Sequence, residues 1–355
     1  MTNTMRQAVA ETTPLIAALL RSHYAPLNEA QLVQTATGID ANKWEQAIHF
    51  HGLAGLIARR HAATIATLLG PEFSERADFL ATRQTRHGLT QAATLKSILD
   101  QFTEAAIPVI PLKGQALSLR LYGELGLRAP GDVDILVDPQ DLPQAIRTLQ
   151  AHGWQFNSPF APDITPALMM QHHHCSFTKG NDIVLELHWR STASPLQALP
   201  DLRSITDQLI ARSGGGLTYL DLPDPLLARL VLTHSARTLC GRLKWAVDTL
   251  DLVPIIDLDN MDPVTRSAAA TALTVCAHAL DLPEQYKLGL ISKTLNIRAH
   301  KDEMMRLSQP GTSILAIANL QRGTIRFLAT MFQHPPATRI RFAGQAVLSL
   351  ILRRR

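Results

Sequence analysis

The sequence has few cysteines, few aromatic residues and no long apolar run. Its three cysteines, Cys175, Cys240 and Cys276, are odd in number, widely separated and without the spacing of metal ligands. They exclude a disulfide framework and suit a reducing compartment, where we expect them to be small buried hydrophobes. The apolar run Pro14–Leu20 is too short for a secretory signal, and no run approaches the ~20 residues of a membrane-spanning helix, so we expect a cytoplasmic protein.

Acidic residues are missing from the C-terminal part of the chain. No Asp or Glu follows Glu303, whereas eight arginines do. Because the whole chain has a net charge of +4, the residues up to Glu303 sum to 4 − 8, or about −4, and the basic character belongs to the tail. The segment Arg339–Arg355 predicts an amphipathic helix with arginines at both ends. We favour a helix that closes a helical bundle; the alternatives are contact with an anionic membrane surface, a partner protein or a nucleic acid.

Aromatic residues make up only 5% of the chain, and no segment interleaves them with basic residues. A platform on which nucleobases stack needs such a pattern, so the composition disfavours nucleic acid as a partner. With 46% hydrophobic and 18% charged residues, the chain is typical of a globular protein rather than a disordered one. Its 355 residues suffice for one large or two ordinary domains.

Two carboxylates stand at the start of an apolar strand in the middle of the chain. The segment Gly131–Val137 is typical of a strand, and in it Asp132 and Asp134 are two positions apart. Their side chains therefore point to the same face, with Cα atoms roughly 6.6 Å apart. Carboxylates so placed can converge on one hard cation or bracket a pair of cations. This pattern is poorly suited to a core and well suited to a metal site.

The residues before this strand predict a turn that leads into a helix. An apolar run, Ile107–Leu112, ends at Lys113 and Gly114, and a helical segment, Gln115–Tyr122, follows.

A later hairpin carries a third acid. Segments His172–Lys179 and Ile183–Trp189 predict two antiparallel strands joined by a glycine-containing turn. The second strand contains Glu186, and His188 shares its face. We expect the hairpin to bring Glu186 towards the first two acids.

The run His172, His173 and His174 in the first arm invites a zinc interpretation. Successive residues of a strand face opposite ways, so at most two of the three rings share a face, and only Cys175 stands beside them as a further zinc ligand. We therefore favour ordinary strand residues near the cleft, one of them facing substrate, over a zinc site.

Helical patterns flank the mixed module on both sides. We expect an N-terminal helical region over residues 1–106, the mixed module over 107–200, and a C-terminal helical region with the basic tail over 201–355. The fold class is α+β, with a small mixed β-sheet module between two helical regions. The expected N-terminal helix starts are Thr13-Pro14, Asn28 and Asp40.

Residues from 107 to 248 also carry a resemblance to a known family. The residues concerned are Lys113, Gly114, Tyr122, Arg128, Asp132, Asp134, Gly153, Trp154, Glu186, His188 and Trp189. Their order is similar to that of a bacterial family of uncharacterised nucleotidyltransferases, with a fold of the DNA polymerase beta type. The resemblance implies transfer of an NMP group from an NTP, such as ATP, to an acceptor with release of pyrophosphate. The acceptor is a small molecule, a sugar or lipid intermediate, or a protein.

The resemblance also assigns roles to the acids. Asp132 and Asp134 would bind two Mg²⁺ ions, or Mn²⁺ in their place. Glu186 would complete the acceptor-side metal site and serve as the base. The attacked phosphorus is shielded by negative oxygens, so the reaction needs concentrated positive charge and in-line positioning more than covalent help.

Further roles concern the nucleotide. Lys113, Gly114 and Arg128 would bind its phosphates, and His188 would touch the acceptor or a phosphate. A later helix has a polar side that either covers the nucleotide cleft or is a solvated surface, two interpretations that we hold about equal. The residues on this side are His234, Arg242, Lys244 and Asp248.

The chain departs from the family in two respects and leaves two other functions open. The usual Gly-Ser turn is here Lys113-Gly114-Gln115, and the interval from Gly114 to Asp132 is longer than in many members of the broad fold. Both departures affect triphosphate binding more than metal binding. One alternative is a non-catalytic nucleotide-binding or scaffold protein that keeps the fold, and the presence of all three acids disfavours it. The other is an RNA-modifying nucleotidyltransferase, which only the basic tail supports.

Overall fold

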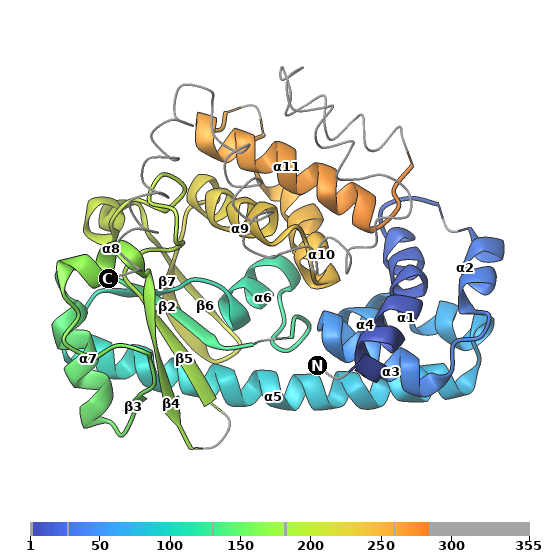
Figure 1. The fold of residues 1–355 in the computed structure, drawn as a ribbon, viewed down its shortest axis with the longest axis horizontal. Helices are drawn as coiled ribbons and strands as arrows, with labels where there is room; N and C mark the ends of the chain where they lie inside the picture. Colours follow the sequence, from blue (N-terminus) through green and yellow to red (C-terminus); the bar gives the residue numbers. More distant parts are fainter. Residues whose placement is uncertain (1–2, 27, 130, 181–182, 259, 284–355) are drawn as a thin grey trace. The chain divides into compact units, whose positions relative to one another are not determined.

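The computed structural model describes residues 3–26, 28–129, 131–180, 183–258 and 260–283, and the predicted helix Arg339–Arg355 lies outside them. The described chain divides into two compact units (Figure 1). The first takes in the described residues up to Thr85, then Leu127–Ala129 and the described residues of 231–283. The second takes in Arg86–Gly126 and the described residues of 130–230. Both predicted boundaries, at residues 106 and 200, fall inside the second unit.

The first unit is helical in its described part. Its N-terminal helices each bury an apolar face, with Leu15, Trp44 and Ile57 fully buried. Two of the three expected helix starts are confirmed, because Asn28 and Asp40 accept hydrogen bonds from the backbone at their helix N-termini. The helices are α1 (Asn3–Arg21), α2 (Glu29–Ala36), α3 (Ala41–His51), α4 (Ala54–Leu68), the start of α5 (Pro71–Glu104), most of α9 (Asp224–Thr238), α10 (Leu243–Leu252), the 3₁₀ turn Val253–Ile255 and α11 (Pro263–Ala279).

The expected start at Thr13-Pro14 is wrong. Helix α1 begins at Asn3 and continues through Pro14. Apolar residues on both sides of the proline are buried, including Val9 and Leu15, so burial of one continuous face outweighs the hydrogen bond that proline cannot donate. Thr13 donates its hydroxyl to the Val9 carbonyl at 2.6 Å.

A five-stranded mixed sheet forms the centre of the second unit. Its order is β1-β2-β5-β4-β3, and β2 and β5 run parallel while the other neighbours run antiparallel. The predicted α+β class and the predicted hairpin of β4 and β5 are confirmed. The strands are β1 (Val109–Pro111), β2 (Val133–Val137), β3 (Gln155–Phe156), β4 (His174–Lys179) and β5 (Ile183–His188).

One face of this sheet is apolar and covered by helices. Val133, Ile135 and Val137 of β2 alternate inward and pack with buried side chains of α5 and α7 (Leu142–Ala151). Helices α5 and α7 lie along this side of the strands in Figure 1. The alternate positions of β2 and β5 therefore point away from this core, and these positions include the acids.

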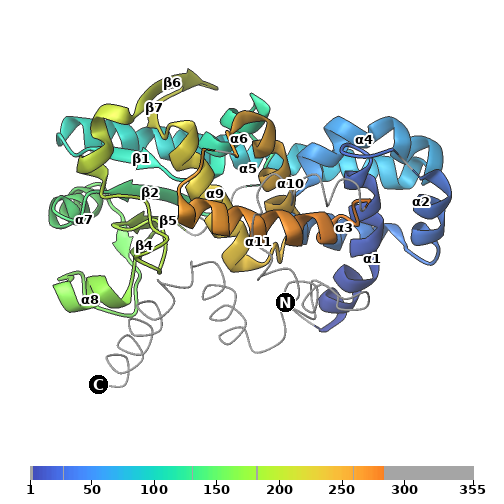
Figure 2. The ribbon, with the colours of Figure 1, turned by 90° about the horizontal axis from the view of Figure 1, so that it is seen from above.

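A second, two-stranded sheet lies where the sequence predicted helix from Leu202 onward. After the 3₁₀ helix Leu202–Gln208 the chain forms β6 (Ile210–Gly214) and β7 (Leu217–Asp221), and β7 lies beside β1 (Figure 2). The prediction of helix here is wrong, because β7 pairs with β6 and its contact with β1 buries Leu217 and Tyr219 in the core of the unit.

Substitutions on the two faces of the hairpin should have unequal costs. Phe177 of β4 is fully buried, whereas Val184 of β5 is 40% exposed. We expect Phe177→Ala to lower the free energy of unfolding by about 3–5 kcal/mol, and Val184→Ala to change it by less than about 1 kcal/mol. Urea denaturation measures both, and equal costs would contradict the assignment of the faces.

Candidate active site

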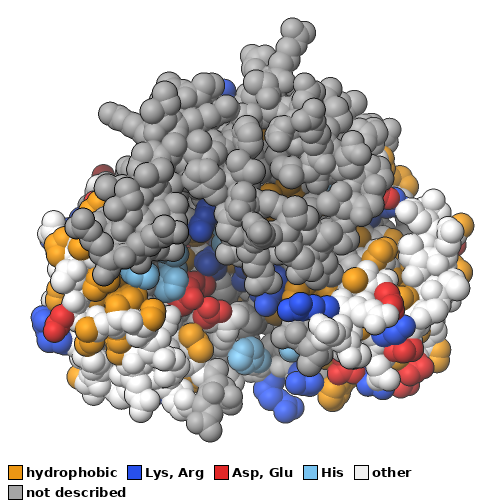
Figure 3. All heavy atoms as spheres, viewed as in Figure 1, with side chains coloured by type: hydrophobic (Ala, Val, Ile, Leu, Met, Phe, Trp, Pro, Cys, Tyr) orange, Lys and Arg blue, Asp and Glu red, His pale blue; other side chains and the backbone are white. Residues whose placement is uncertain are grey.

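The register of the sheet brings two acids side by side. Asp134 of β2 pairs with Glu186 of β5, and these parallel strands place paired side chains on the same face. Asp132 stands directly before β2 and is half-buried. The three acids that the sequence predicted as a cluster therefore lie together at one place in the second unit. Acidic and histidine side chains also lie next to one another on the face drawn in Figure 3.

His188 lies between the carboxylates. Its ring is 3% exposed, and its Nε2 is 3.1 Å from Asp134 Oδ1 and 3.2 Å from Glu186 Oε2. Because carboxylates only accept, Nε2 carries the proton and donates. Burial alone lowers the pKa of His188, but its hydrogen bonds to Asp134 and Glu186 outweigh burial and raise it. The sequence placed His188 on the face of Glu186, and the structure confirms that placement.

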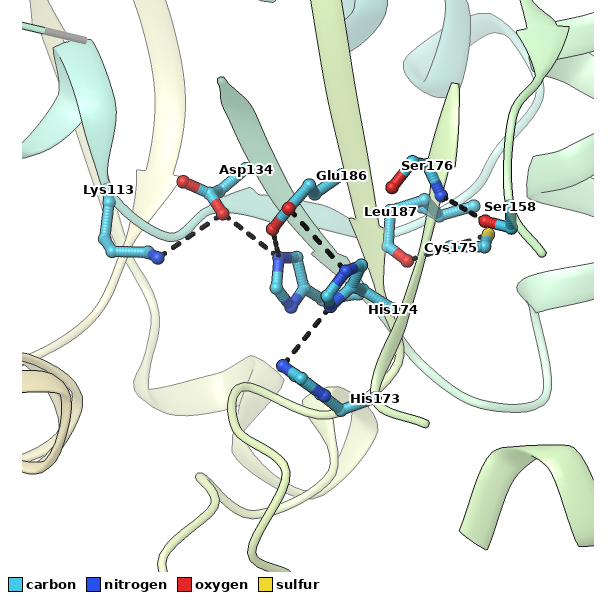
Figure 4. A network of polar contacts seen from close by, with 10 residues as sticks. Lys113, Asp134, Ser158, His173, His174, Cys175, Ser176, Glu186 and Leu187 are labelled. Atoms are coloured by element: carbon cyan, nitrogen blue, oxygen red, sulfur yellow. Dashed lines mark hydrogen bonds and ion pairs between the residues drawn. The ribbon is translucent and has the colours of Figure 1, made fainter. Parts of the chain in front are cut away.

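Lys113 supplies a positive charge. Its Nζ is 3.4 Å from Asp134 Oδ1, and Figure 4 shows its side chain directed at this carboxylate. Lys113 stands at the N-cap of α6 (Gly114–Tyr122). Gly114 has φ of +63°, a conformation that favours glycine, and a Cβ built there would lie 3.8 Å from the Asp132 carbonyl oxygen. The turn is therefore packed against the acidic strand.

The negative charge of Asp132 is poorly compensated by its neighbours. Burial, then the charges of Asp134 and Glu186, raise its pKa to about 6, although the charge of Lys113 opposes them. Burial also raises the pKa of Glu186, but the hydrogen bond from His188 outweighs it and lowers the pKa overall. His188 and Lys113 thus compensate Asp134 and Glu186 and leave Asp132 poorly compensated. A cation bound beside Asp132 would favour its ionised form, so a carboxyl pKa raised by neighbouring carboxylates is typical of a cation site.

Gln91, a residue without any role predicted from the sequence, holds the segment before Asp132. Its Nε2 donates to the Gly131 carbonyl at 2.7 Å, and its side chain lines a pocket with Lys113, Gly114 and the two aspartates. Gln91 is 3% exposed within the long helix α5. Nothing in a helical pattern distinguishes it from a solvated glutamine, so no sequence signal could have identified it.

His174 also reaches the cluster. Its Nε2 is 3.6 Å from Glu186 Oε1, and its Nδ1 is 3.2 Å from His173 Nε2. Burial lowers the pKa of His174, with the charge of His188 acting in the same direction. His172 instead stacks on Phe160, with ring centroids 4.6 Å apart. The two rings that converge are therefore His173 and His174, whereas strand alternation predicts that neighbouring rings face opposite ways.

The remaining predicted residues lie in the first unit. Arg128 is 4% exposed, and its Nε donates to Asp248 Oδ2 at 2.8 Å. Lys244 donates to the Ala129 carbonyl at 2.9 Å, so it holds the same short segment. The His234 and Trp245 rings pack edge to face. The phosphate-binding and cleft roles of these residues stay predictions.

Arg242 also lies in the first unit, where its guanidinium stacks over the ring of Phe50 at 5.4 Å from the centroid. This contact is a cation–π interaction, which fixes the orientation of the guanidinium within the first unit. Its predicted cleft role likewise stays a prediction.

The chain belongs to a known family of transferases. A family model described as "Uncharacterised nucleotidyltransferase" matches residues 37–285, and the chain is therefore a member of that family. No curated protein and no solved structure matches the chain. Within the described residues no helix is both long and apolar enough to cross a membrane.

The raised pKa of Asp132 predicts a stability change without any metal. Because the folded pKa of about 6 exceeds the ordinary value of 3.8, ionised Asp132 destabilises the folded state, and this cost grows as the pH rises through that interval. In a chelator we expect Asp132→Asn to be more stable than the wild type by about 1 kcal/mol at pH 8, discounted for partial exposure, and equal to it at about pH 4.

Thermal unfolding at both pH values measures this difference. The matched control is Asp163→Asn, which changes an exposed aspartate of the same unit and should leave stability within about 0.5 kcal/mol of the wild type. A less stable Asp132→Asn at pH 8 would contradict the electrostatic account of the cluster.

The buried pair in the first unit should be costly to break. Asp248→Ala removes the carboxylate that Arg128 contacts in a buried environment, and we expect a loss of about 3–5 kcal/mol in unfolding free energy. The exposed pair of Lys96 and Asp100, at 2.7 Å, is the control, and Asp100→Ala should cost less than about 1 kcal/mol. Similar costs in chemical denaturation would show that Arg128 does not depend on Asp248.

Proposed function

We propose that the protein is a Mg²⁺-dependent nucleotidyltransferase that moves an NMP group from an NTP to an acceptor and releases pyrophosphate. The observation that carries the proposal is the pairing of Asp134 with Glu186, next to an Asp132 whose charge is poorly compensated. Family membership supports the class of reaction. Mn²⁺ is the alternative metal, because it also accepts oxygen ligands.

The residues present fit a divalent cation with oxygen ligands. Asp132, Asp134 and Glu186 offer six carboxylate oxygens in one half-buried cluster, and Mg²⁺ prefers such ligands. When bound, two such ions would lower the pKa of the acceptor and neutralise charge on the triphosphate. Asp134, Glu186 and His188 also have ligand atoms within 4.8 Å of one another.

The turn at Lys113 and Gly114 is the part of the site that we assign to the phosphates. The Lys113 side chain does not cap α6, so the first backbone N–H groups of this helix are suited to phosphate oxygens. Lys113 adds a positive charge whose present partner, Asp134, would be shared with a metal ion. Gln115 in place of the usual serine leaves this backbone feature unchanged.

Glu186 is the residue that we assign to the acceptor. Its lowered pKa keeps it ionised near neutrality, so it can accept the proton of an acceptor hydroxyl or amine. The acceptor atom then bonds to the α-phosphorus, and the bond from that phosphorus to the bridging oxygen of pyrophosphate breaks. His188 holds Glu186 and Asp134 in place through Nε2. A small molecule, a sugar or lipid intermediate, or a protein would supply the acceptor group.

Nucleotide binding tests this function without knowledge of the acceptor. We expect isothermal calorimetry to show binding of at least one NTP that requires Mg²⁺. Asp134→Asn should weaken it about 100-fold or more, because a metal ligand is lost from a site in which the metal bridges protein and phosphates. Asp163→Asn, which changes an exposed aspartate of the same unit, should bind as the wild type does.

Two outcomes would contradict the proposal. One is the absence of Mg²⁺-dependent binding for all four NTPs by the folded wild type. The other is equal binding by Asp134→Asn, which would remove Asp134 from the metal site.

A further inference from the structure

Three imidazoles converge beside the carboxylates. One ligand nitrogen from each of His173, His174 and His188 lies within 4.8 Å of the others. The ring of His188 lies 4.9 Å from that of His174 and 5.7 Å from that of His173, measured between centroids. This set is distinct from the carboxylate oxygens that suit Mg²⁺, because nitrogen ligands suit softer metals.

Neighbouring residues of a regular strand point to opposite faces, so the convergence of His173 and His174 needs a cause. His173 precedes β4 and adopts a bend rather than strand conformation. Its carbonyl accepts hydrogen bonds from the backbone N–H groups of Trp189 at 3.1 Å and Arg190 at 3.3 Å. Figure 4 shows the His173 and His174 rings directed at each other. The backbone at the end of the hairpin therefore fixes this pair of rings.

The carboxylates hold two of the rings from the opposite side. Nε2 of His188 donates to Asp134 and Glu186, and Nε2 of His174 faces Glu186 Oε1 at 3.6 Å. A histidine that binds a metal almost always donates its other ring N–H to a carboxylate, carbonyl or water, which fixes its tautomer and orientation. His188 has this form, and His174 Nε2 lies within ion-pair distance of the same Glu186 carboxylate.

The other nitrogen of His188 is left without a partner. Its Nδ1 is buried, and no hydrogen-bond partner for it exists within the described residues. A buried unpaired polar atom costs free energy, and binding of an ion removes that cost. His188 therefore offers one nitrogen to the carboxylates and has the second available.

We propose that His173, His174 and His188 bind a transition-metal ion of the Zn²⁺ class. The 3.2 Å between His173 Nε2 and His174 Nδ1 is close to the roughly 3.3 Å that separates two nitrogens of a tetrahedral zinc site with Zn–N bonds of about 2.0–2.1 Å. Three histidines leave the fourth position open for water or another ligand. His188 belongs to this site through Nδ1 and contacts the carboxylates through Nε2.

The three-histidine site and the carboxylate site are coupled by Asp134 and Glu186. A metal on the imidazoles fixes these rings, and through them the two carboxylates that we assign to Mg²⁺. The inference does not rest on nucleotide transfer, because it concerns binding of a metal ion by the protein alone.

Cobalt is the probe that tests the site. Metal-free, full-length protein is titrated with Co²⁺ in millimolar Mg²⁺, which occupies oxygen sites, and the visible absorption of the Co²⁺ is recorded. We expect the intense bands of tetrahedral Co²⁺ to saturate at one equivalent and to disappear when Zn²⁺ is added. His173→Gln and His174→Gln should each weaken Co²⁺ binding about 100-fold or more, since loss of a ligand exceeds the 10–100-fold effect of an outer partner.

Two further variants separate this site from adventitious binding. His172→Gln changes the adjacent ring, which stacks on Phe160, and should bind Co²⁺ within about twofold of the wild type. Glu186→Gln, which loses the charge that orients two ligand rings, should bind about 10–100-fold more weakly. Circular dichroism of each variant establishes that it is folded.

The results can overturn this inference separately from the proposed function. Absence of tetrahedral Co²⁺ bands in the wild type overturns it, and so do bands that persist in both His173→Gln and His174→Gln. Nucleotide binding is measured on the same samples. Mg²⁺-dependent NTP binding without a Co²⁺ site overturns only the three-histidine site, and a Co²⁺ site without NTP binding overturns only the transferase proposal.

Discussion

The parallel pairing of β2 with β5 is the constraint on which the site depends. It sets Asp134 beside Glu186, and it does so because both strands bury their alternate residues in the same core. A slip of one residue would turn the apolar side chains outward and the acids into the core, so packing of the apolar face fixes the position of the acids. The chemistry on one face is thus held in register by the hydrophobic effect on the other.

That register brings three carboxylates together, and the described residues compensate their negative charge only in part. Three carboxylates meet in a half-buried place, where the charges of Asp134 and Glu186 raise the pKa of Asp132. Lys113 supplies positive charge to Asp134, and His188 donates hydrogen bonds to Asp134 and Glu186, but Asp132 has no such hydrogen bond from His188. The divalent cation that we propose would complete the compensation. The other nitrogens of His174 and His188 are those that we assign to the second metal ion.

The sequence predicted the parts of this site that follow from short-range periodicity. Two acids two positions apart before an apolar run, and a hairpin with a third acid, were sufficient to predict the α+β class and the meeting of Asp134 with Glu186. The β6–β7 strands were missed, because their burial depends on contact with β1 and the rest of the core rather than on their own pattern. Gln91 was missed for the same reason, since its partner is a carbonyl 40 residues away.

Other features depend on backbone geometry that cannot be predicted from the spacing of residues in the sequence. The convergence of His173 with His174 depends on a bend before β4, whereas strand alternation alone separates them. The contact of Arg128 with Asp248 joins residues 120 positions apart, and the resemblance alone assigned Arg128 to phosphate. Long-range contacts of this kind are determined by tertiary packing, which local propensity does not encode.

The most direct test of the central claim is crystallographic. Crystals grown with Mn²⁺ and a non-hydrolysable NTP analogue would be measured at the manganese absorption edge. The account predicts anomalous density at coordination distance from Asp132 and Asp134, about 2.0–2.6 Å from their carboxylate oxygens. Density confined to other places, with nucleotide bound and the acids contacting only His188 and Lys113, would contradict it.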